Sequence, residues 1–206
     1  MTRVCASTST NCLPTGRRAA DVSVTTDIPR AWLRPRAVMA RRFAQGPDEK
    51  IAFVYLAAAS VLGFVAQLPG LVRTSRLSDP AFEAEIVSEA ARVGVAIPTD
   101  LADAKFEALF SGAVMGWIFI VPLFLYILAF CSHLLAKMMG GKGTGLRARV
   151  ALFWSVLAVT PALLLLGLTT GFVGPGPAQA LVAAVTLSGF IWIWLNSLYV
   201  AETLNV

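Results

Sequence analysis

The apolar residues of this chain are gathered into four long blocks that shorter polar segments separate. The blocks run near 51–72, 111–136, 150–173 and 178–200. Each is long enough to cross a bilayer, because a hydrocarbon core of ~30 Å needs about 20 helical residues. A globular core does not concentrate its apolar residues in this way. The pattern predicts an all-α fold, a polytopic membrane helix bundle with about four transmembrane helices.

Composition strengthens this prediction. Of the 206 residues, 57% are hydrophobic and only 14% are charged, against about 25% charged residues in an ordinary soluble domain. The formal net charge of +5 and the isoelectric point near 9.5 would suit a nucleic-acid partner. In a membrane protein, however, the positions of the basic residues matter more than their sum. The lipid bilayer is therefore the expected partner, and no nucleic acid is expected.

The N-terminal part divides into two segments. Residues 1–27 are rich in Ser, Thr and Ala and contain no apolar run that could serve in a signal peptide. We expect a disordered tail there or, alternatively, a start codon assigned too early. Residues 28–46 alternate arginines with apolar side chains, which predicts a short basic amphipathic helix in the headgroup layer with Pro35 in its first turn. This segment either only sets the orientation of the protein or binds specific lipids or a partner.

The segment between the first two blocks is acidic. Residues 73–110 hold seven acidic and four basic side chains. Asp79 before Pro80 predicts a helix start, and Gly94 predicts its end. Asp100 predicts a second start that leads into the next block. We therefore expect a helical hairpin on the membrane surface, with acids spaced as on a solvated helix face and with neither a metal-binding nor a catalytic role.

The distribution of Lys and Arg predicts the orientation, because these residues concentrate on cytoplasmic flanks. Of the 17, nine lie in residues 1–50, four in the acidic hairpin, four in 137–149 and none beyond. With an even number of spans, both termini are expected in the cytoplasm and the hairpin outside, in a bacterial inner membrane. The transmembrane domain is expected over 47–200, followed by a short C-terminal tail at 201–206.

Basic side chains on this cytoplasmic face are the candidate contacts for anionic headgroups, another membrane protein or a second copy of the chain. They are Arg34, Arg36, Arg41, Arg42, Lys142, Arg147 and Arg149. Lys142 lies in a glycine-rich loop, Gly140 to Gly145. This loop lacks the preceding strand and the Ser or Thr after the lysine that a phosphate-binding P-loop requires. We expect a flexible turn with weak headgroup contacts.

No pattern indicates an enzyme, a metal site or a cofactor. His133 and Cys131 are two residues apart on a helix and point in different directions, so they do not chelate together. His133 is expected to bind water or a backbone carbonyl, with proton sensing or a functional polar contact as the alternative. Charged residues within a span would be the strongest sign of a transporter, because each is costly in lipid and usually functional. The four blocks contain none. Gln67 and Asn196 could instead line a small polar pocket.

Two pairs of glycines are spaced four residues apart in apolar helices. They are Gly112 with Gly116 and Gly167 with Gly171. This spacing allows close approach of helix backbones. Packing within the chain is the favoured interpretation of both pairs, and contact between copies or chance spacing are the alternatives.

Four motifs in the second half of the chain are a glycine-rich loop, a proline-interrupted helix, a Gly-Pro turn and a Trp-rich end. They lie at Gly140 to Arg149, Thr160-Pro161, Gly174-Pro175-Gly176 and Phe190 to Leu195. Together with the basic opening from Pro29 to Arg42, they resemble bacterial members of the Yip family over roughly residues 28–200. Eukaryotic relatives in that family bind small GTPases of the Rab/Ypt type and usually have five spans. This chain departs from that pattern with four predicted spans, so their trafficking role is not carried over. The resemblance implies a non-enzymatic multispan adaptor or membrane-organising protein.

Two functions remain open. A membrane scaffold or adaptor would use the basic segment and the loop around Lys142. A small transporter or channel subunit would use polar groups near Gln67 and Asn196. The transporter should have a water-accessible cavity at mid-membrane, whereas the adaptor should have a dry bundle with a binding surface outside it.

Overall fold

The computed structural model describes residues 24–96 and 100–203, so the disorder expected of residues 1–23 lies outside the described part. Helices cover almost all of it. The α-helices are α1 (Val24–Leu33), α2 (Pro35–Ala44), α3 (Glu49–Arg76), α4 (Pro80–Val93), α5 (Leu101–Met115), α6 (Val121–Met138), α7 (Gly145–Leu168) and α8 (Pro177–Thr203). Two π-helical segments, η1 (Gly116–Ile120) and η2 (Thr169–Val173), continue α5 and α7.

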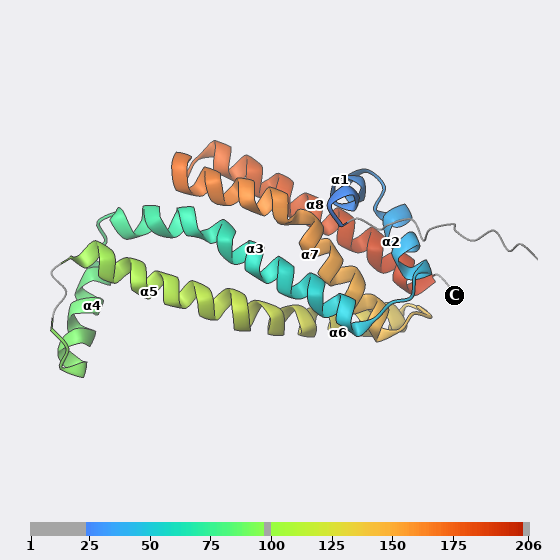
Figure 1. Cartoon of the computed structure of the whole chain (residues 1–206), viewed down its shortest axis with the longest axis horizontal. Coiled ribbons are helices and arrows are strands. Elements are labelled where there is room, and N and C mark those ends of the chain that lie inside the picture. Colours follow the sequence, from blue (N-terminus) through green and yellow to red (C-terminus); the bar gives the residue numbers. More distant parts are fainter. Residues whose placement is uncertain (1–23, 97–99, 204–206) are drawn as a thin grey trace, which may run out of the picture.

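Four helical segments are long and apolar enough to cross a membrane. They are Glu49–Arg76, Leu101–Met138, Gly145–Val173 and Pro177–Thr203. They run along the long axis of the molecule (Figure 1), and no strand occurs in residues 24–96 or 100–203. The predicted all-α bundle with four transmembrane helices is confirmed.

These helices are longer than the apolar blocks because their ends are capped in the polar flanks. The Asp48 carboxylate accepts a hydrogen bond from the Lys50 amide at 3.2 Å, at the start of α3. The Thr144 hydroxyl accepts one from the Arg147 amide at 3.4 Å, at the start of α7. Leu101–Met138 is one continuous helix of 38 residues, about 57 Å long at 1.5 Å per residue, so it projects beyond a ~30 Å hydrocarbon core.

Helix α7 is the central helix of the bundle. Of its most apolar stretch, 56% is buried, against 11% for the stretch in Leu101–Met138. It packs between α3 and α8 and buries the adjacent aromatic residues Phe153 and Trp154. The α5–α6 helix instead leaves large side chains such as Phe119 and Leu123 exposed, as expected of a surface that faces lipid.

Close contact between α3 and α7 depends on glycine. A Cβ atom added at Gly167 would overlap the carbonyl oxygen of Ala66, and one added at Gly171 would overlap Pro69. Around Gly112 and Gly116, an added Cβ atom meets no described atom within 4 Å. The Gly167 pair therefore packs within the chain, as predicted, whereas the Gly112 pair does not.

A proline inside α7 is accommodated by its neighbour. Pro161 has no amide hydrogen to donate to the Leu157 carbonyl one turn earlier. The Thr160 hydroxyl donates to that carbonyl instead, at 2.7 Å. Figure 1 shows that α7 changes direction part-way along its length, which is the usual effect of an interior proline.

The predicted hairpin between the first two spans is present. The Asp79 carboxylate accepts from the Phe82 amide at 3.3 Å, and α4 ends at Gly94, whose φ is 74°. The Asp100 carboxylate accepts from the Ala102 amide at 2.8 Å, at the start of α5. Helix α4 runs across one end of the bundle (Figure 1), which we call the α4 end.

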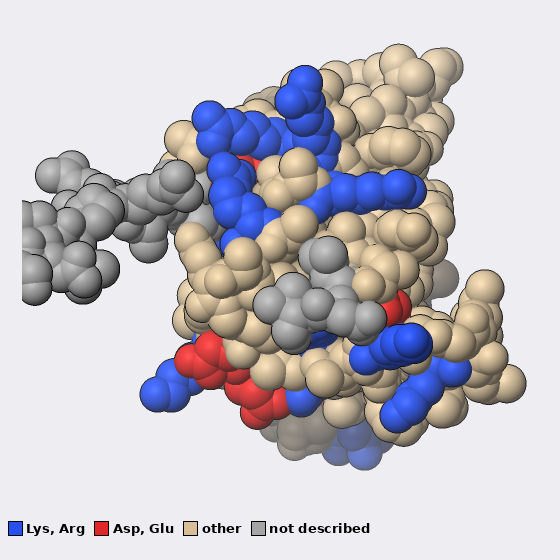
Figure 2. Space-filling view, turned by 90° about the vertical axis from the view of Figure 1, so that its right-hand side faces the viewer, with Lys and Arg blue, Asp and Glu red and all other residues tan. Residues whose placement is uncertain are grey.

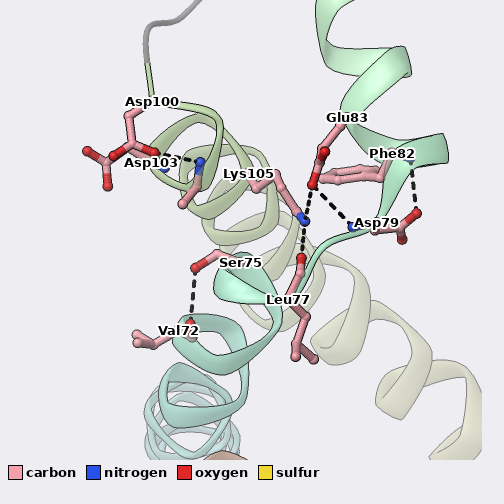
Figure 3. Close-up of polar contacts among 10 residues, drawn as sticks. Val72, Ser75, Leu77, Asp79, Phe82, Glu83, Asp100, Asp103 and Lys105 are labelled. Carbon is pink, nitrogen blue, oxygen red and sulfur yellow. Dashed lines mark hydrogen bonds and ion pairs between the residues drawn. The ribbon is translucent and has the colours of Figure 1, made fainter.

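A buried lysine joins this hairpin to the first span (Figure 3). Lys105 is only 2% exposed, and its Nζ donates to the Leu77 carbonyl, just beyond the end of α3. The same ammonium group lies 3.3 Å from Glu83 Oε1 in the first turn of α4. One cation therefore ties α5 to the end of α3 and the start of α4.

The predicted limits of the terminal segments need correction. Residues 24–27, assigned to a disordered tail, are the first turn of α1, and the basic segment forms two helices instead of one. These helices pack on α7 and α8 because their inward faces are apolar. At the C-terminus, residues 201–203, assigned to a tail, continue α8, and Glu202 is buried there.

Candidate functional site

Helices α1 and α2 form a cap on one end of the bundle. We call residues 24–44 the arginine cap and this end the basic end. The Trp32 indole nitrogen donates to the Ala158 carbonyl of α7 at 3.0 Å, and its ring occupies the space beside Gly189 of α8. The buried apolar side chains of the cap are Ala31, Val38, Met39 and Phe43. Packing on both helices fixes the cap to the bundle.

A cluster of charged and aromatic side chains lies under the cap. Asp27 is 1% exposed and Arg42 is 6% exposed, and Arg42 Nη2 donates to Asp27 Oδ2 at 2.9 Å. The Arg42 guanidinium also donates to the Tyr55 hydroxyl. It stacks on the Trp154 indole, with 3.5 Å between the guanidinium carbon and the ring centroid. Arg41 Nη2 donates to Asp27 Oδ1 at 2.5 Å.

This cluster couples the cap to two transmembrane helices. Asp27 belongs to α1 and Arg42 to α2, while their aromatic partners belong to α3 and α7. Charges removed from water are stable only when they are paired and hydrogen-bonded. Stacking of the guanidinium on indole adds a cation–π attraction. The ion pair is therefore buried and held against its aromatic partners only while the cap is docked on the bundle, although Arg42 Nε has no hydrogen-bond partner among the described residues.

The outer face of the cap is basic. Figure 2 shows Lys and Arg side chains gathered over the upper part of the basic end. Three arginines, Arg30, Arg34 and Arg41, line an open groove of about 580 Å³ between α1 and α2. The apolar side chains of the groove are Leu33, Ala37 and Val38. The groove thus combines cationic walls with an apolar surface.

A fourth arginine of the cap extends along α8. Arg36 Nε donates to Asn196 Oδ1 at 2.7 Å, and its guanidinium carbon lies 4.7 Å from the centroid of the Tyr199 ring. Asn196 also donates to the Trp192 carbonyl at 2.7 Å. The exposed side of this contact is flanked by apolar and aromatic side chains of α8.

The predicted contact residues of the cap divide into two groups. Arg34 and Arg36 are exposed, and Arg41 is half-buried with part of its guanidinium on Asp27. Arg42 is buried under the cap, so it is not available to a lipid or a partner, which corrects its assignment. The difference arises because Arg42 lies between the cap and the bundle, whereas Arg34 faces outward and Arg36 lies on the exposed surface of α8.

The predicted contact residues near the start of α7 are partly engaged by the protein itself. Arg149 Nη2 forms an ion pair with Glu49 Oε1 at 2.5 Å. The guanidinium carbon of Arg147 lies 5.7 Å from the centroid of the Phe43 ring in the cap. Both arginines are half-buried, whereas Lys142 in the glycine-rich loop is exposed.

The glycine-rich loop binds a carboxylate of the chain itself. Glu202 of α8 is 7% exposed and accepts from the Gly143 amide at 2.9 Å. Its other carboxylate oxygen lies 2.9 Å from His133 Nδ1, and the Lys142 amide donates to the Glu202 carbonyl at 3.1 Å. The loop is therefore tied to α8 instead of forming a free turn, and His133 contacts a carboxylate instead of water or a backbone carbonyl.

A cavity of about 290 Å³ lies between α3, η1, α7 and α8, nearer the α4 end. The polar side chains on its wall are Gln67, Thr170 and Gln179, and Gln179 Nε2 donates to Thr170 Oγ1 at 3.0 Å. Asn196 lies instead at the contact with Arg36. The expected pocket shared by Gln67 and Asn196 is therefore not present.

Sequence reasoning missed three buried charges: Asp27, Lys105 and Glu202. Asp27 lies in the first turn of α1, where an acid after two threonines is a recognisable start signal. Lys105 and Glu202 carry no comparable local signal. Within residues 24–96 and 100–203, no group of three or more His, Cys, Asp or Glu side chains could hold a metal ion.

The fold and the site define the class of the protein. It is a multi-pass, all-α membrane protein with four candidate membrane-spanning helices and a basic cap docked on one end. No family model, no curated protein and no solved structure matches the chain. Kinship with the Yip family remains a prediction from the sequence motifs.

Proposed function

We propose that this protein is a non-enzymatic membrane scaffold or adaptor, related to the Yip family, and that the arginine cap is its contact surface. The basic end then faces the cytoplasm of a bacterial cell from the inner membrane, with both termini on that side. The observation that carries the proposal is the two-sided cap. On its inner side, the buried Asp27–Arg42 ion pair joins α1 to α2. On its outer side, arginines such as Arg30 and Arg34 are exposed.

A rigid arginine surface is suited to binding anionic groups. Guanidinium groups form strong, directional hydrogen bonds to phosphates and carboxylates. Fixing the backbone beneath them before binding reduces the conformational entropy lost on contact. Because Arg42 and Trp32 hold the cap on α7, the outer arginines project from a surface that is already in place.

The test is photo-crosslinking in intact membranes. A photoreactive residue at Ala37, in the groove of the cap, is expected to capture the same membrane or cytoplasmic partner reproducibly, as identified by mass spectrometry. A photoreactive residue at Ala84, exposed on α4, is the position control. Equal capture from both positions, or no partner at Ala37, would contradict a contact role for the cap.

The charge dependence of that capture is the matched control. The double variant Arg30→Gln/Arg34→Gln is expected to reduce capture at Ala37 about thirtyfold, since each basic residue near an anionic surface contributes about 1 kcal/mol. Arg76→Gln/Arg92→Gln removes the same charge from the α4 end and should leave capture unchanged. Equal losses in both variants would indicate a general charge effect and not a site.

Passage of a small polar solute is a second candidate function, favoured by the cavity near Gln67. Both π-helical segments adjoin this region, and π-helical turns are frequent at functional sites. Gln67→Leu is expected to abolish flux into vesicles containing the purified protein, while Asn196→Leu, outside the cavity, should retain it. Equal flux through the wild type and Gln67→Leu would remove this alternative.

A further inference from the structure

The ends of α6 and α8 lie at the same level at the basic end. His133 of α6 contacts the Glu202 carboxylate of α8, and the loop that follows α6 is bonded to Glu202 through two amides. These contacts place His133 and Glu202 at one common level, from which depth into the membrane can be counted on both the α6 face and the α8 face. Each residue along a helix corresponds to 1.5 Å of depth.

On the α6 face, apolar surface continues to this level and beyond. Leu134 and Leu135 are 51% and 60% exposed, one and two residues past His133. The exposed Lys137 comes next, about 6 Å beyond His133 along the helix, and Met138 and Met139 after it are more exposed still. Large apolar side chains in such a row are stable where hydrocarbon covers them. The apolar layer on this face therefore extends to the level of Glu202.

On the α8 face, charge begins much deeper. The Arg36 guanidinium lies between Asn196 and Tyr199, about 5 to 9 Å below the level of Glu202 along the helix. Trp192 and Tyr199 are both 55% exposed, and these residue types prefer the boundary between headgroups and hydrocarbon. Tyr199 lies at the shallow end of the Arg36 range and Trp192 about 15 Å below Glu202. The headgroup boundary of this face is therefore expected to be at least as deep as the Arg36 guanidinium.

The inner side of the arginine cap reaches at least as deep. Arg42 stacks on Trp154 and Trp32 donates to Ala158, which lie nine and thirteen residues into α7 from Gly145, beside His133. Arg30 lies in α1 and Arg34 directly before α2, and both are exposed. A cation held in hydrocarbon at this depth is costly unless water or an anion reaches it.

We propose that the arginine cap draws phospholipid phosphates into the leaflet at the basic end, so that the headgroup layer beside α8 lies about 5 to 9 Å deeper than beside α6. The phosphates bind Arg30, Arg34 and Arg36, and an acyl chain lies along the apolar part of the groove near Leu33. Charge complementarity and depth select a lipid phosphate over an acidic protein segment. The inference rests on the proposed contact role of the cap and specifies its ligand.

The test compares the depths of two matched labels in the full-length protein. Cys5, Cys12 and Cys131 are first replaced with Ser, and a nitroxide is placed at Leu195 on α8 or at Leu134 on α6, which are 53% and 51% exposed. In a flat leaflet, Leu195 would lie about 10 Å deeper than Leu134. If the headgroup layer lies deeper beside α8, this difference in depth is expected to fall below about 5 Å. Power saturation with oxygen and a nickel chelate measures the depth of each label.

The vesicles contain phosphatidylcholine with a quarter phosphatidylglycerol. In them the triple variant Arg30→Gln/Arg34→Gln/Arg36→Gln should restore a difference of about 10 Å between the two labels. Arg76→Gln/Arg92→Gln is the charge control and should behave like the wild type. A difference of about 10 Å in the unsubstituted cap, or no change in the triple variant, would overturn the proposal.

Lipid retention provides a second measurement. Native mass spectrometry of protein released from these vesicles is expected to find phosphatidylglycerol bound to the wild type and about thirtyfold less on Arg30→Gln/Arg34→Gln. Equal retention by the two proteins would contradict a phosphate site. Spin–spin broadening at Leu195 would instead identify a second copy of the chain as the occupant and overturn the lipid proposal.

The experiments distinguish failure of the lipid site from failure of the proposed adaptor function. Purified vesicles contain no other protein, so thinning and lipid retention report on phospholipid alone. Capture of a protein at Ala37 in intact membranes without lipid retention would support the adaptor and reject the lipid site. Lipid retention without a captured protein would support the lipid site and reject the adaptor.

Discussion

Replacing Asp27 with alanine is expected to lower the free energy of unfolding by about 3 to 5 kcal/mol, because it leaves the Arg42 guanidinium buried without its carboxylate. The cap should detach first, since Asp27 and Arg42 supply the ion pair beneath it. Tryptophan fluorescence during denaturant titration in mixed micelles measures this loss, because Trp32 and Trp154 lie at the interface.

Two variants separate the buried pair from charge in general. Asp27→Leu combined with Arg42→Met replaces both ions with apolar groups and should recover most of the lost stability. Glu89→Ala breaks the exposed ion pair with Arg92 on α4, 2.5 Å in length, and should change stability little. An Asp27→Ala protein as stable as the wild type would show that the ion pair does not hold the cap.

Replacing Gly167 with alanine is expected to cost about 3 kcal/mol, at the upper end of overpacking penalties. The added Cβ atom would overlap the Ala66 carbonyl oxygen, and a backbone atom cannot rotate away as a side chain can. Helices α3 and α7 would have to separate, and their packing is central to the bundle. The same denaturant titration measures the change.

Gly112→Ala is the matched control, because Gly112 is also the first of two glycines spaced four apart but has open space around it. Alanine has the higher helix propensity, so this variant is expected to be neutral or stabilising by up to about 1 kcal/mol. A loss at Gly112 similar to that at Gly167 would mean that a second copy of the chain covers this face.

The hairpin illustrates what can be predicted locally. Asp79, Gly94 and Asp100 act within one helical turn of their own positions, and the structure has the helix ends there. An N-cap carboxylate and a left-handed glycine satisfy nearby backbone groups whatever the rest of the fold does. The Gly112 and Gly167 pairs show the opposite case, since the same spacing gives close packing in one helix and open space in the other.

The four membrane helices follow directly from the apolar blocks of the chain, because a backbone in lipid must satisfy its hydrogen bonds within each segment and an apolar block of sufficient length therefore becomes a helix. The positions of the buried charges depend instead on tertiary packing. Arg42 contacts Asp27 and Trp154, and Glu202 contacts Gly143, across stretches of chain that carry no local signal of the contact. Burial and pairing depend on which helix faces meet, so the arginines that face inward hold the cap and those that face outward form its contact surface.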